Sequence, residues 1–324
     1  MKNNLSRFLT LGFAIATLAF AAIPADAQYP DKPGRIQVGF PAGGGADIMA
    51  RWYADKLQKA SGGTFIVENK VGASGNLALN AAGKAKPDGL TLLMASTVTT
   101  AGNAAVFKNM PIDVTKDIIS IVSFAETPFV LAVAPNSQIN SVADLTAYIK
   151  GKGGKATYGS ATTAALALTA IYLKSAGLEA THVGYKTTAN AIQDVTGRQI
   201  DFAFADVVFA TGQAKQGRIK LLAIGSDERS PGLPDVPSLK DSGAASGDIT
   251  PLWGFWAPTG TQKDILDKLA KWINDVTNSD ETQKFLLTQG ATPKSGTQEE
   301  YKKRFVSALK AWAAVVTLAK IEAQ

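Results

Sequence analysis

The sequence predicts an α/β fold in which two domains enclose a cleft. Short apolar runs typical of buried strands alternate with segments of helical periodicity along most of the chain. Two hydrophobic segments flanked by Pro, Ser and Gly, residues 124–128 and 253–258, have the character of crossings between domains. A glycine-rich turn, residues 40–47, joins the first predicted strand to the first predicted helix and directs attention to one end of a sheet.

The predicted strands and helices follow from this alternation. The runs rich in β-branched, aromatic and small apolar residues are 36–40, 65–68, 91–95, 118–124, 129–134, 156–159, 181–184, 200–205 and 221–225. The helical patterns are 48–59, 75–85, 142–150, 166–176, 189–196, 207–216, 263–276 and 298–320. Because strand–helix alternation produces parallel pairs, we expect two mixed sheets in which parallel pairing predominates.

The two crossings define the expected domains. If the chain passes between domains at both, the first domain comprises residues 28–128 plus 252–324, and the second, residues 129–251, is inserted into it. Two connecting strands of this kind allow a cleft to open and close about a hinge.

Residues 1–27 have the features of a signal peptide. Lys2 and Arg7 precede an apolar run from Phe8 to Ile23, and residues 25–27 fit the rule for cleavage after small residues. The apolar run is shorter than the roughly 20 residues that span a membrane. We therefore expect an exported, periplasmic protein that begins at Gln28.

Composition excludes several kinds of site. There is no cysteine and one histidine, so thiol chemistry and metal sites built from several imidazoles are excluded. We expect no metal and no cofactor. The formal charge is +6, and removal of Lys2, Arg7 and Asp26 leaves +5. This charge is scattered, which favours encounter with small anions and not with nucleic acid. A monomer is expected.

The glycine-rich turn predicts an anion site. First-turn N–H groups of a helix have no intrahelical acceptor and carry the positive end of its dipole. Three glycines let a ligand approach this backbone closely. The turn lacks the third glycine of a dinucleotide fingerprint and the Gly-Lys-Ser/Thr of a phosphate loop. An ordinary turn capped by Asp47 is the alternative. The candidate ligand-binding residues here are Phe40, Gly43, Gly44, Gly45, Ala46 and Asp47.

The order of motifs resembles the Bug-type receptors, the periplasmic solute-binding proteins of tripartite tricarboxylate transporters. The blocks that carry the resemblance span nearly the whole chain after the predicted cleavage site. They are YPDKP (29–33), FPAGGGAD (40–47), VENKVGASGN (67–76), AKPDGLTLL (85–93), GRQIDF (197–202), RSPGLPDVPS (229–238) and APTGT (257–261).

This resemblance implies a periplasmic-binding-protein fold of type II-like architecture that closes on a small organic carboxylate and delivers it to membrane permease subunits. It also implies a second ligand-holding loop, opposite the first, at Ser160, Ala161, Thr162 and Thr163. Asp206, at a predicted strand end, matches an acidic position of the family's cleft. A helix cap is the alternative role for Asp206.

Two further positions follow from local pattern. Ser74 lies in residues 72–75, which open a predicted helix, and Thr97 lies in residues 96–100, which follow a predicted strand and offer four hydroxyls. Both stretches could edge the cleft. Serine and threonine at such positions are commonly turn or cap residues, which is the alternative.

The chain departs from the family pattern at three places. The second loop lacks the frequent Ser-His pair, residues 183–187 replace a V-P-Y-K-G segment, and the first loop has one proline where two are usual. These changes favour a less polar pocket and a ligand with an apolar middle, such as an aliphatic or aromatic, terephthalate-like dicarboxylate. Trp253, Phe255 and Trp256 could flank such a ligand, although packing in the core is the commoner fate of large aromatics.

Two other classes of function remain open at this stage. A periplasmic hydrolase could use Ser160, His182 and Asp206 as nucleophile, base and orienting acid. However, Ser160 lacks the G-x-S-x-G turn of many hydrolases, and His182 lies in a strand pattern. A scaffold protein is the third class. The sequence favours a carboxylate receptor that is not an enzyme, but it does not name the ligand.

Overall fold

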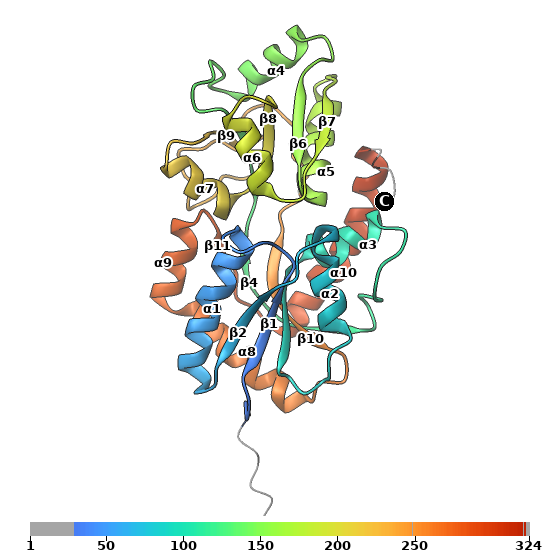
Figure 1. Cartoon of the computed structure of the whole chain (residues 1–324), viewed down its shortest axis with the longest axis vertical. Coiled ribbons are helices and arrows are strands. Elements are labelled where there is room, and N and C mark those ends of the chain that lie inside the picture. The colour runs from blue at the N-terminus through green and yellow to red at the C-terminus, as the bar shows by residue number, and fades with distance from the viewer. Residues whose placement is uncertain (1–28, 248, 320, 322–324) are drawn as a thin grey trace, which may run out of the picture.

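The computed structural model describes residues 29–247, 249–319 and 321, and its elements form two sheets with helices around each (Figure 1). The predicted signal peptide lies outside the described residues. One sheet and its helices occupy the lower part of Figure 1, and the other sheet with its helices occupies the upper part.

The first sheet has six strands in the order β11-β4-β10-β3-β1-β2. Its strands β1 and β3 pair in parallel, as do β1 and β2, whereas β10 is antiparallel to both β3 and β4. The strands are β1 (Gly34–Val38), β2 (Phe65–Asn69), β3 (Thr91–Ser96), β4 (Ile118–Glu126), β10 (Leu252–Pro258) and β11 (Thr292–Pro293).

Helices and two short helical turns pack around this sheet. They are α1 (Gly45–Ser61), α2 (Asn76–Gly83), α3 (Asn103–Val106), α8 (Lys263–Asn278), α9 (Asp280–Thr288) and α10 (Gln298–Ala319), with a 3-10 turn η1 (Ala73–Gly75) and a π-helical turn η2 (Val98–Gly102). A hydrogen bond of 2.8 Å between the hydroxyls of Tyr53 and Thr277 ties α1 to α8. The ring of Trp52 stacks on Phe285 at 3.9 Å, which ties α1 to α9.

The second sheet has five strands in the order β7-β6-β8-β5-β9. Strand β6 pairs in parallel with β7 and β8, and β5 is antiparallel to β8 and β9. The elements are β5 (Phe129–Val133), β6 (Thr157–Ser160), β7 (Thr181–Gly184), β8 (Phe202–Asp206), β9 (Lys220–Ile224), α4 (Val142–Gly151), α5 (Thr163–Ser175), α6 (Thr188–Thr196) and α7 (Val207–Lys215).

The chain passes from the first sheet to the second at Thr127 and Pro128 and returns before Leu252. Two hydrogen bonds join the segments there: Thr127 N donates to Pro251 O at 3.0 Å, and Trp253 Nε1 donates to Thr127 Oγ1 at 2.7 Å. These two hydrogen bonds hold the two connecting segments together.

The structure confirms the α/β class with two mixed sheets and forms a strand at each predicted position. Residues 252–258 form an inner strand of the first sheet, and the chain turns from one sheet to the other just before them. Helix α9 was not predicted. It begins directly after α8, capped by Ser279, so the two read in sequence as a single polar stretch.

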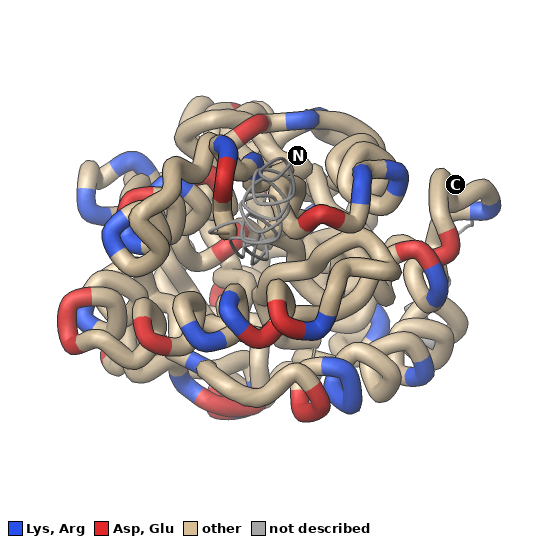
Figure 2. The backbone as a smooth tube through the Cα atoms, turned by 90° about the horizontal axis from the view of Figure 1, so that it is seen from below, with Lys and Arg blue, Asp and Glu red and all other residues tan. Residues whose placement is uncertain are grey.

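The described part of the chain carries charges of both signs. In the view of Figure 2, Lys and Arg alternate with Asp and Glu along the chain and do not merge into one basic stripe. Within residues 29–247 and 249–319, no helix combines the length and the apolar character needed to cross a bilayer. The described residues also hold no cluster of three acidic, His or Cys side chains suited to a metal ion.

Candidate functional site

A cavity of about 190 Å³ lies where residues of the two sheets meet. The starts of α1, α5 and α6 contribute to its lining, as do the residues that cap α2 and α7. Because a helix start carries the positive end of its dipole, this convergence favours an anionic ligand. Among the described lining residues, Lys186 and Asp206 are the only ones with charged side chains.

The start of α1 offers backbone donors to this cavity. The first intrahelical hydrogen bond runs from Ile48 N to Gly44 O at 3.0 Å, so the N–H groups of Gly45, Ala46 and Asp47 have no acceptor within the helix. Gly43, Gly44, Gly45 and Ala46 all line the cavity. This matches the geometry of an oxyanion site at a helix start.

Asp47 holds the loop in place from behind. Its carboxylate accepts hydrogen bonds from Gly43 N, Arg51 Nε and Asn69 Nδ2, each at 2.9 Å. The side chain is buried, and these partners together keep the pKa of Asp47 below its usual value even though burial alone would raise it. Asn69 Nδ2 also donates to Phe40 O at 2.9 Å. The Asp47 side chain is therefore occupied within the loop, and the residue lies outside the cavity lining.

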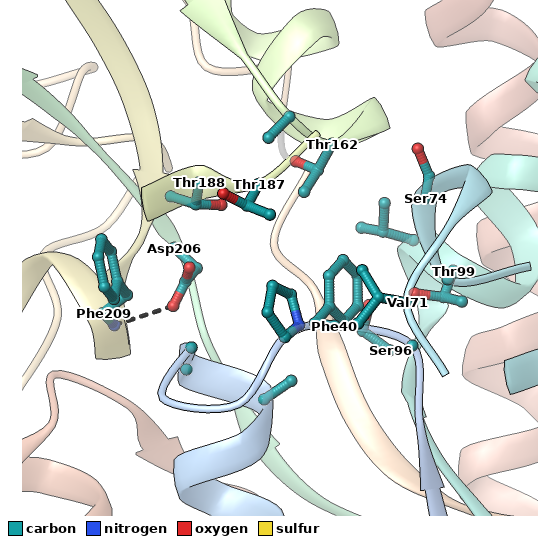
Figure 3. A pocket seen from close by; sticks show the side chains of 18 of the residues that line it. Phe40, Val71, Ser74, Ser96, Thr99, Thr162, Thr187, Thr188, Asp206 and Phe209 are labelled. Carbon is teal, nitrogen blue, oxygen red and sulfur yellow. Dashed lines mark hydrogen bonds between the residues drawn. The ribbon is translucent and has the colours of Figure 1, made fainter. Parts of the chain in front are cut away.

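Asp206 lies directly against the start of α1. A Cβ added to Gly45 would fall 2.1 Å from Asp206 Oδ1 and 2.9 Å from Val208 Cβ, so only glycine fits between the two halves here. Asp206 is also the cap of α7, accepting from Phe209 N at 2.9 Å (Figure 3). It fulfils the predicted cap role and lines the cavity as well.

Burial raises the pKa of Asp206 to about 6, and the hydrogen bond from Phe209 N opposes this only in part. No ion pair joins Asp206 to a cation within the described part of the chain. A second negative charge beside it would raise its pKa further. A carboxylate bound at the α1 start would therefore favour the protonated form of Asp206.

Threonines form the wall that faces the α1 start. Thr162, Thr187 and Thr188 lie together on the second-sheet side in Figure 3. Thr162 caps α5 by accepting from Ala165 N at 3.2 Å, which leaves its O–H free to donate. The hydroxyl of Thr188 has no partner among the described residues, and Lys186 lies on the exposed rim beside it.

The floor between these walls is apolar. The ring of Phe40 packs edge-on against Trp253, with centroids 6.3 Å apart. Val71, Phe129 and Phe209 add further apolar surface to the lining. Of the three aromatics near the second crossing, Trp253 lines the cavity, whereas Phe255 packs against Tyr53 and Phe124, and Trp256 packs against α10.

The remaining wall comes from η1, the end of β3 and the turn η2. Ser74, Ser96 and Thr99 line the cavity, and Ser74 and Thr99 lie on the same side of Phe40 in Figure 3. Asn103 braces this wall: its Nδ2 donates to Ser74 O and Asn76 Oδ1, both at 2.9 Å. Its Oδ1 accepts from Thr163 Oγ1 at 2.9 Å, a bond that links the two halves.

The structure gathers most of the predicted site residues around one cavity. Those that line it are Phe40, Gly43, Gly44, Gly45, Ala46, Ser74, Ala161, Thr162, Thr163 and Asp206. Besides Asp47, two lie outside the lining. Thr97 Oγ1 accepts from Leu252 N at 3.2 Å and so supports the second crossing. The hydroxyl of Ser160 lies 2.7 Å from His182 Nε2.

Among the described residues, no acidic side chain is hydrogen-bonded to His182 of the Ser160–His182 pair. His182 stacks on Tyr158, its cross-strand neighbour, and burial lowers the pKa of the imidazole. Asp206, the third member of the suggested triad, bonds to Phe209 N, and within the described residues no hydrogen bond joins it to His182. Ser160 is also absent from the cavity lining.

Several lining residues were not predicted. Lys186, Thr187, Thr188 and Ala189 form the loop and start of α6, and the departure from V-P-Y-K-G at 183–187 marked this segment without assigning it a role. A useful signal was present: Thr187 precedes a helical pattern after a strand, as Thr162 does. Ser96 and Thr99 belong to the hydroxyl-rich stretch 96–100 expected at a cleft edge, from which Thr97 alone was chosen as a candidate. Phe209 carried no such signal.

The sequence and the fold are similar to those of known proteins. Residues 49–320 match the model of the tripartite tricarboxylate transporter family receptor. The chain belongs to this family. It is 29% identical to protein BugT of Bordetella pertussis over 317 residues, covering 97% of each chain. Its structure is similar to that of R. palustris Rpa4515 with adipate, with a TM-score of 0.87, 25% identity, and coverage of 91% of this chain and 99% of the other.

A second structure agrees on the fold. The periplasmic binding protein BugD superposes with a TM-score of 0.85 and 27% identity, covering 91% of this chain and all of the other. The Bug-type resemblance and the periplasmic-binding-protein fold expected from the sequence are thus confirmed, and the family consists of periplasmic receptors.

Proposed function

We propose that this protein is a periplasmic receptor that captures a small organic dicarboxylate in the cavity and delivers it to membrane permease subunits. The observation that carries the proposal is the convergence of helix starts on one cavity with an apolar floor. Helix starts stabilise carboxylates, and the apolar floor suits the carbon chain between them. The adipate named for the R. palustris relative is a ligand of this kind.

In the proposed complex, one carboxylate accepts hydrogen bonds from the N–H groups of Gly45 and Ala46. Thr162 and Thr188, on the opposite wall, donate their hydroxyl protons to the ligand. Because these donors come from both halves, a bound acid bridges them and stabilises the closed form. The closed form is the state that we propose the permease recognises. The unbranched middle of the acid would lie over Phe40 and Trp253.

We propose that the cavity binds its ligand without catalysing a reaction. Neither Ser160 nor His182 lines it, so we expect stoichiometric binding and no turnover of esters or amides. The family relationship is with binding proteins. We also propose residues 28–128 plus 252–324 and residues 129–251 as the two bodies that close on the ligand.

A thermal-shift screen of residues 28–324 against mono-, di- and tricarboxylic acids, including aromatic ones, tests the proposal. A ligand that binds only the native state at a hundredfold excess over Kd adds about 2.7 kcal/mol of stability. For a chain of this size the midpoint should rise by several degrees. A shift confined to one series of acids is the expected result. No shift with any acid, or hydrolysis of an ester analogue, would contradict it.

A further inference from the structure

The wall formed by Ser96 and Thr99 contains hydroxyl groups without a partner. Each residue retains only 3% of its exposure, and each lines the cavity. No hydrogen bond to the side-chain oxygen of either residue occurs among the described residues. Neither side-chain oxygen is among the fully buried polar atoms that lack a partner, so both hydroxyls open onto the cavity. Two hydroxyls on one cavity wall are therefore available to a ligand.

The neighbouring hydroxyls of Thr97 and Thr100, by contrast, are hydrogen-bonded within the protein. Thr97 Oγ1 accepts from Leu252 N at 3.2 Å, and Thr100 Oγ1 donates to Ser96 O at 3.2 Å. Neither of these residues lines the cavity. Within the stretch 96–100, the side chains that face away from the cavity are thus satisfied, and the two hydroxyls that line it are not.

The start of α2 lies next to this wall. Gly75, the cap residue of α2, adopts a φ of +96°, and a Cβ placed on it would meet Thr99 Cγ2 at 2.9 Å. Thr99 Oγ1 lies 3.6 Å from the same point and the Phe40 ring 3.7 Å from it. Glycine at this position thus brings the helix start, a free hydroxyl and the apolar floor together.

The charges around the wall decide what it would bind. Lys186 and Asp206, the charged residues among the described lining, do not belong to this wall, and Figure 3 places Asp206 on the other side of Phe40 from Thr99. The positive end of α2 disfavours an ammonium group here and favours an anion. Two neutral hydroxyls can both donate to a carboxylate.

We infer that Ser96 and Thr99, beside the positive end of α2, form a second carboxylate subsite, separated by the Phe40 ring from the one at the α1 start. This inference rests on the proposed function and sharpens it. The receptor would select acids that carry a carboxylate at each end of an apolar chain, and would discriminate against monocarboxylates of the same length.

The test is a calorimetric titration with adipate, hexanoate and 6-hydroxyhexanoate, which share a chain length and differ at one end. The variants are wild type, the double variant Ser96→Ala with Thr99→Val, and the matched control Thr100→Val. For the wild type we expect adipate to bind at least about tenfold more tightly than the other two acids, as for hydrogen bonds to a charged group. The double variant should lose that preference while its hexanoate affinity is unchanged. Thr100→Val should keep the preference.

Each other outcome is informative. Equal weakening of adipate and hexanoate in the double variant would overturn the subsite, because it would indicate a general packing defect. An unchanged preference for adipate in the double variant would overturn it as well, and the proposed function would stand. Binding of 6-hydroxyhexanoate as tightly as adipate would overturn the carboxylate assignment at this wall. Failure of the wild type to bind any of these acids, combined with a negative thermal-shift screen, would overturn the proposed function itself.

Discussion

The wall that the first sheet supplies to the cavity presents mainly backbone at the α1 start, whereas the facing wall presents threonine side chains. At the α1 start the donors are N–H groups, and Asp206 fills the space that a side chain at Gly45 would need. On the facing wall, Thr162 and Thr187 cap their own helices and border the cavity at the same time. Backbone N–H groups bind an anion whatever the side chain, and the close contact at Gly45 tolerates few substitutions. The threonines of the facing wall, by contrast, can be substituted to change which ligand is bound.

This comparison predicts the largest effect for Gly45→Ala. The added methyl would meet Asp206 Oδ1 at 2.1 Å and Val208 Cβ at 2.9 Å, so either the Asp206 side chain leaves its place at the α7 start or the two sheets move apart. Overpacking costs about 1–3 kcal/mol, so carboxylate affinity should fall by up to about a hundredfold. Calorimetry measures the change.

A matched control for Gly45→Ala is Gly212→Ala, where a Cβ would meet nothing within 4 Å. The control should bind as the wild type does, and both variants should retain cooperative thermal unfolding. Wild-type affinity in Gly45→Ala would contradict the close approach of the two halves in the bound state.

A smaller effect is expected on the threonine wall, from Thr188→Val. Its hydroxyl has no partner in the described residues, so in the proposed complex the substitution removes one hydrogen bond to a carboxylate and little else. Because Thr188 is partly exposed, we expect the low end of the range for a hydrogen bond to a charged group, about 1.5 kcal/mol, which corresponds to about tenfold in Kd. Thr196→Val on the same helix is the control, because that hydroxyl already donates to Ile192 O at 2.8 Å. If both variants bind equally well, Thr188 does not contact the ligand.

The pH dependence tests the role of Asp206 between the two walls. The pKa of Asp206 is raised from 3.8 to about 6, so the folded state binds this proton more tightly than the unfolded state does. The contribution to stability is fully present below about 3.8 and is lost as the pH rises through about 6. Carboxylate binding raises the pKa further, so affinity should weaken as the pH rises above about 6.

Asp206→Asn should flatten both profiles. Asparagine is also a good helix cap, so the α7 start should remain intact. Thermal unfolding and calorimetry on either side of pH 6 measure the two profiles. A wild-type affinity that rises with pH would contradict this assignment, as would a variant that keeps the wild-type pH dependence.

The smallest effect is expected for Ser160→Ala. The Ser160 hydroxyl is bonded to His182 and lies outside the cavity lining, so carboxylate affinity should stay within about twofold of wild type, as is usual for substitutions that do not touch the ligand. A loss comparable to that of Thr188→Val would return Ser160 to the binding site. Ester turnover that disappears in this variant would support the hydrolase alternative.

Local pattern was sufficient for the strands and for much of the cavity lining, because apolar runs, glycines and caps act over a few residues. The α1 loop and the Thr162 cap were predictable for that reason. What could not be predicted depends on which side chains already have partners. Asp47 and Thr97 fit a ligand site by type, yet their oxygens are bonded to Gly43 N and Leu252 N.

The missed residues illustrate the same limit. The stretch 96–100 was recognisable as rich in hydroxyls, but which of them face the cavity depends on how the end of β3 continues into the π-helical turn. Ser96 and Thr99 line the cavity, whereas Thr97 and Thr100 do not. The lining by Phe209 depends on the packing of α7 against α1, which joins residues far apart in the sequence. Neither arrangement leaves a mark in composition or periodicity.

The most direct test of the central claim is amide NMR of the wild-type protein during titration with adipate. If one carboxylate binds the α1 start, the N–H resonances of Gly45 and Ala46 should show the largest downfield shifts, with those at the start of α5 and α6 moving at the same ligand ratio. Saturable binding that leaves the Gly45 and Ala46 amides unmoved would contradict the claim that this helix start holds the ligand.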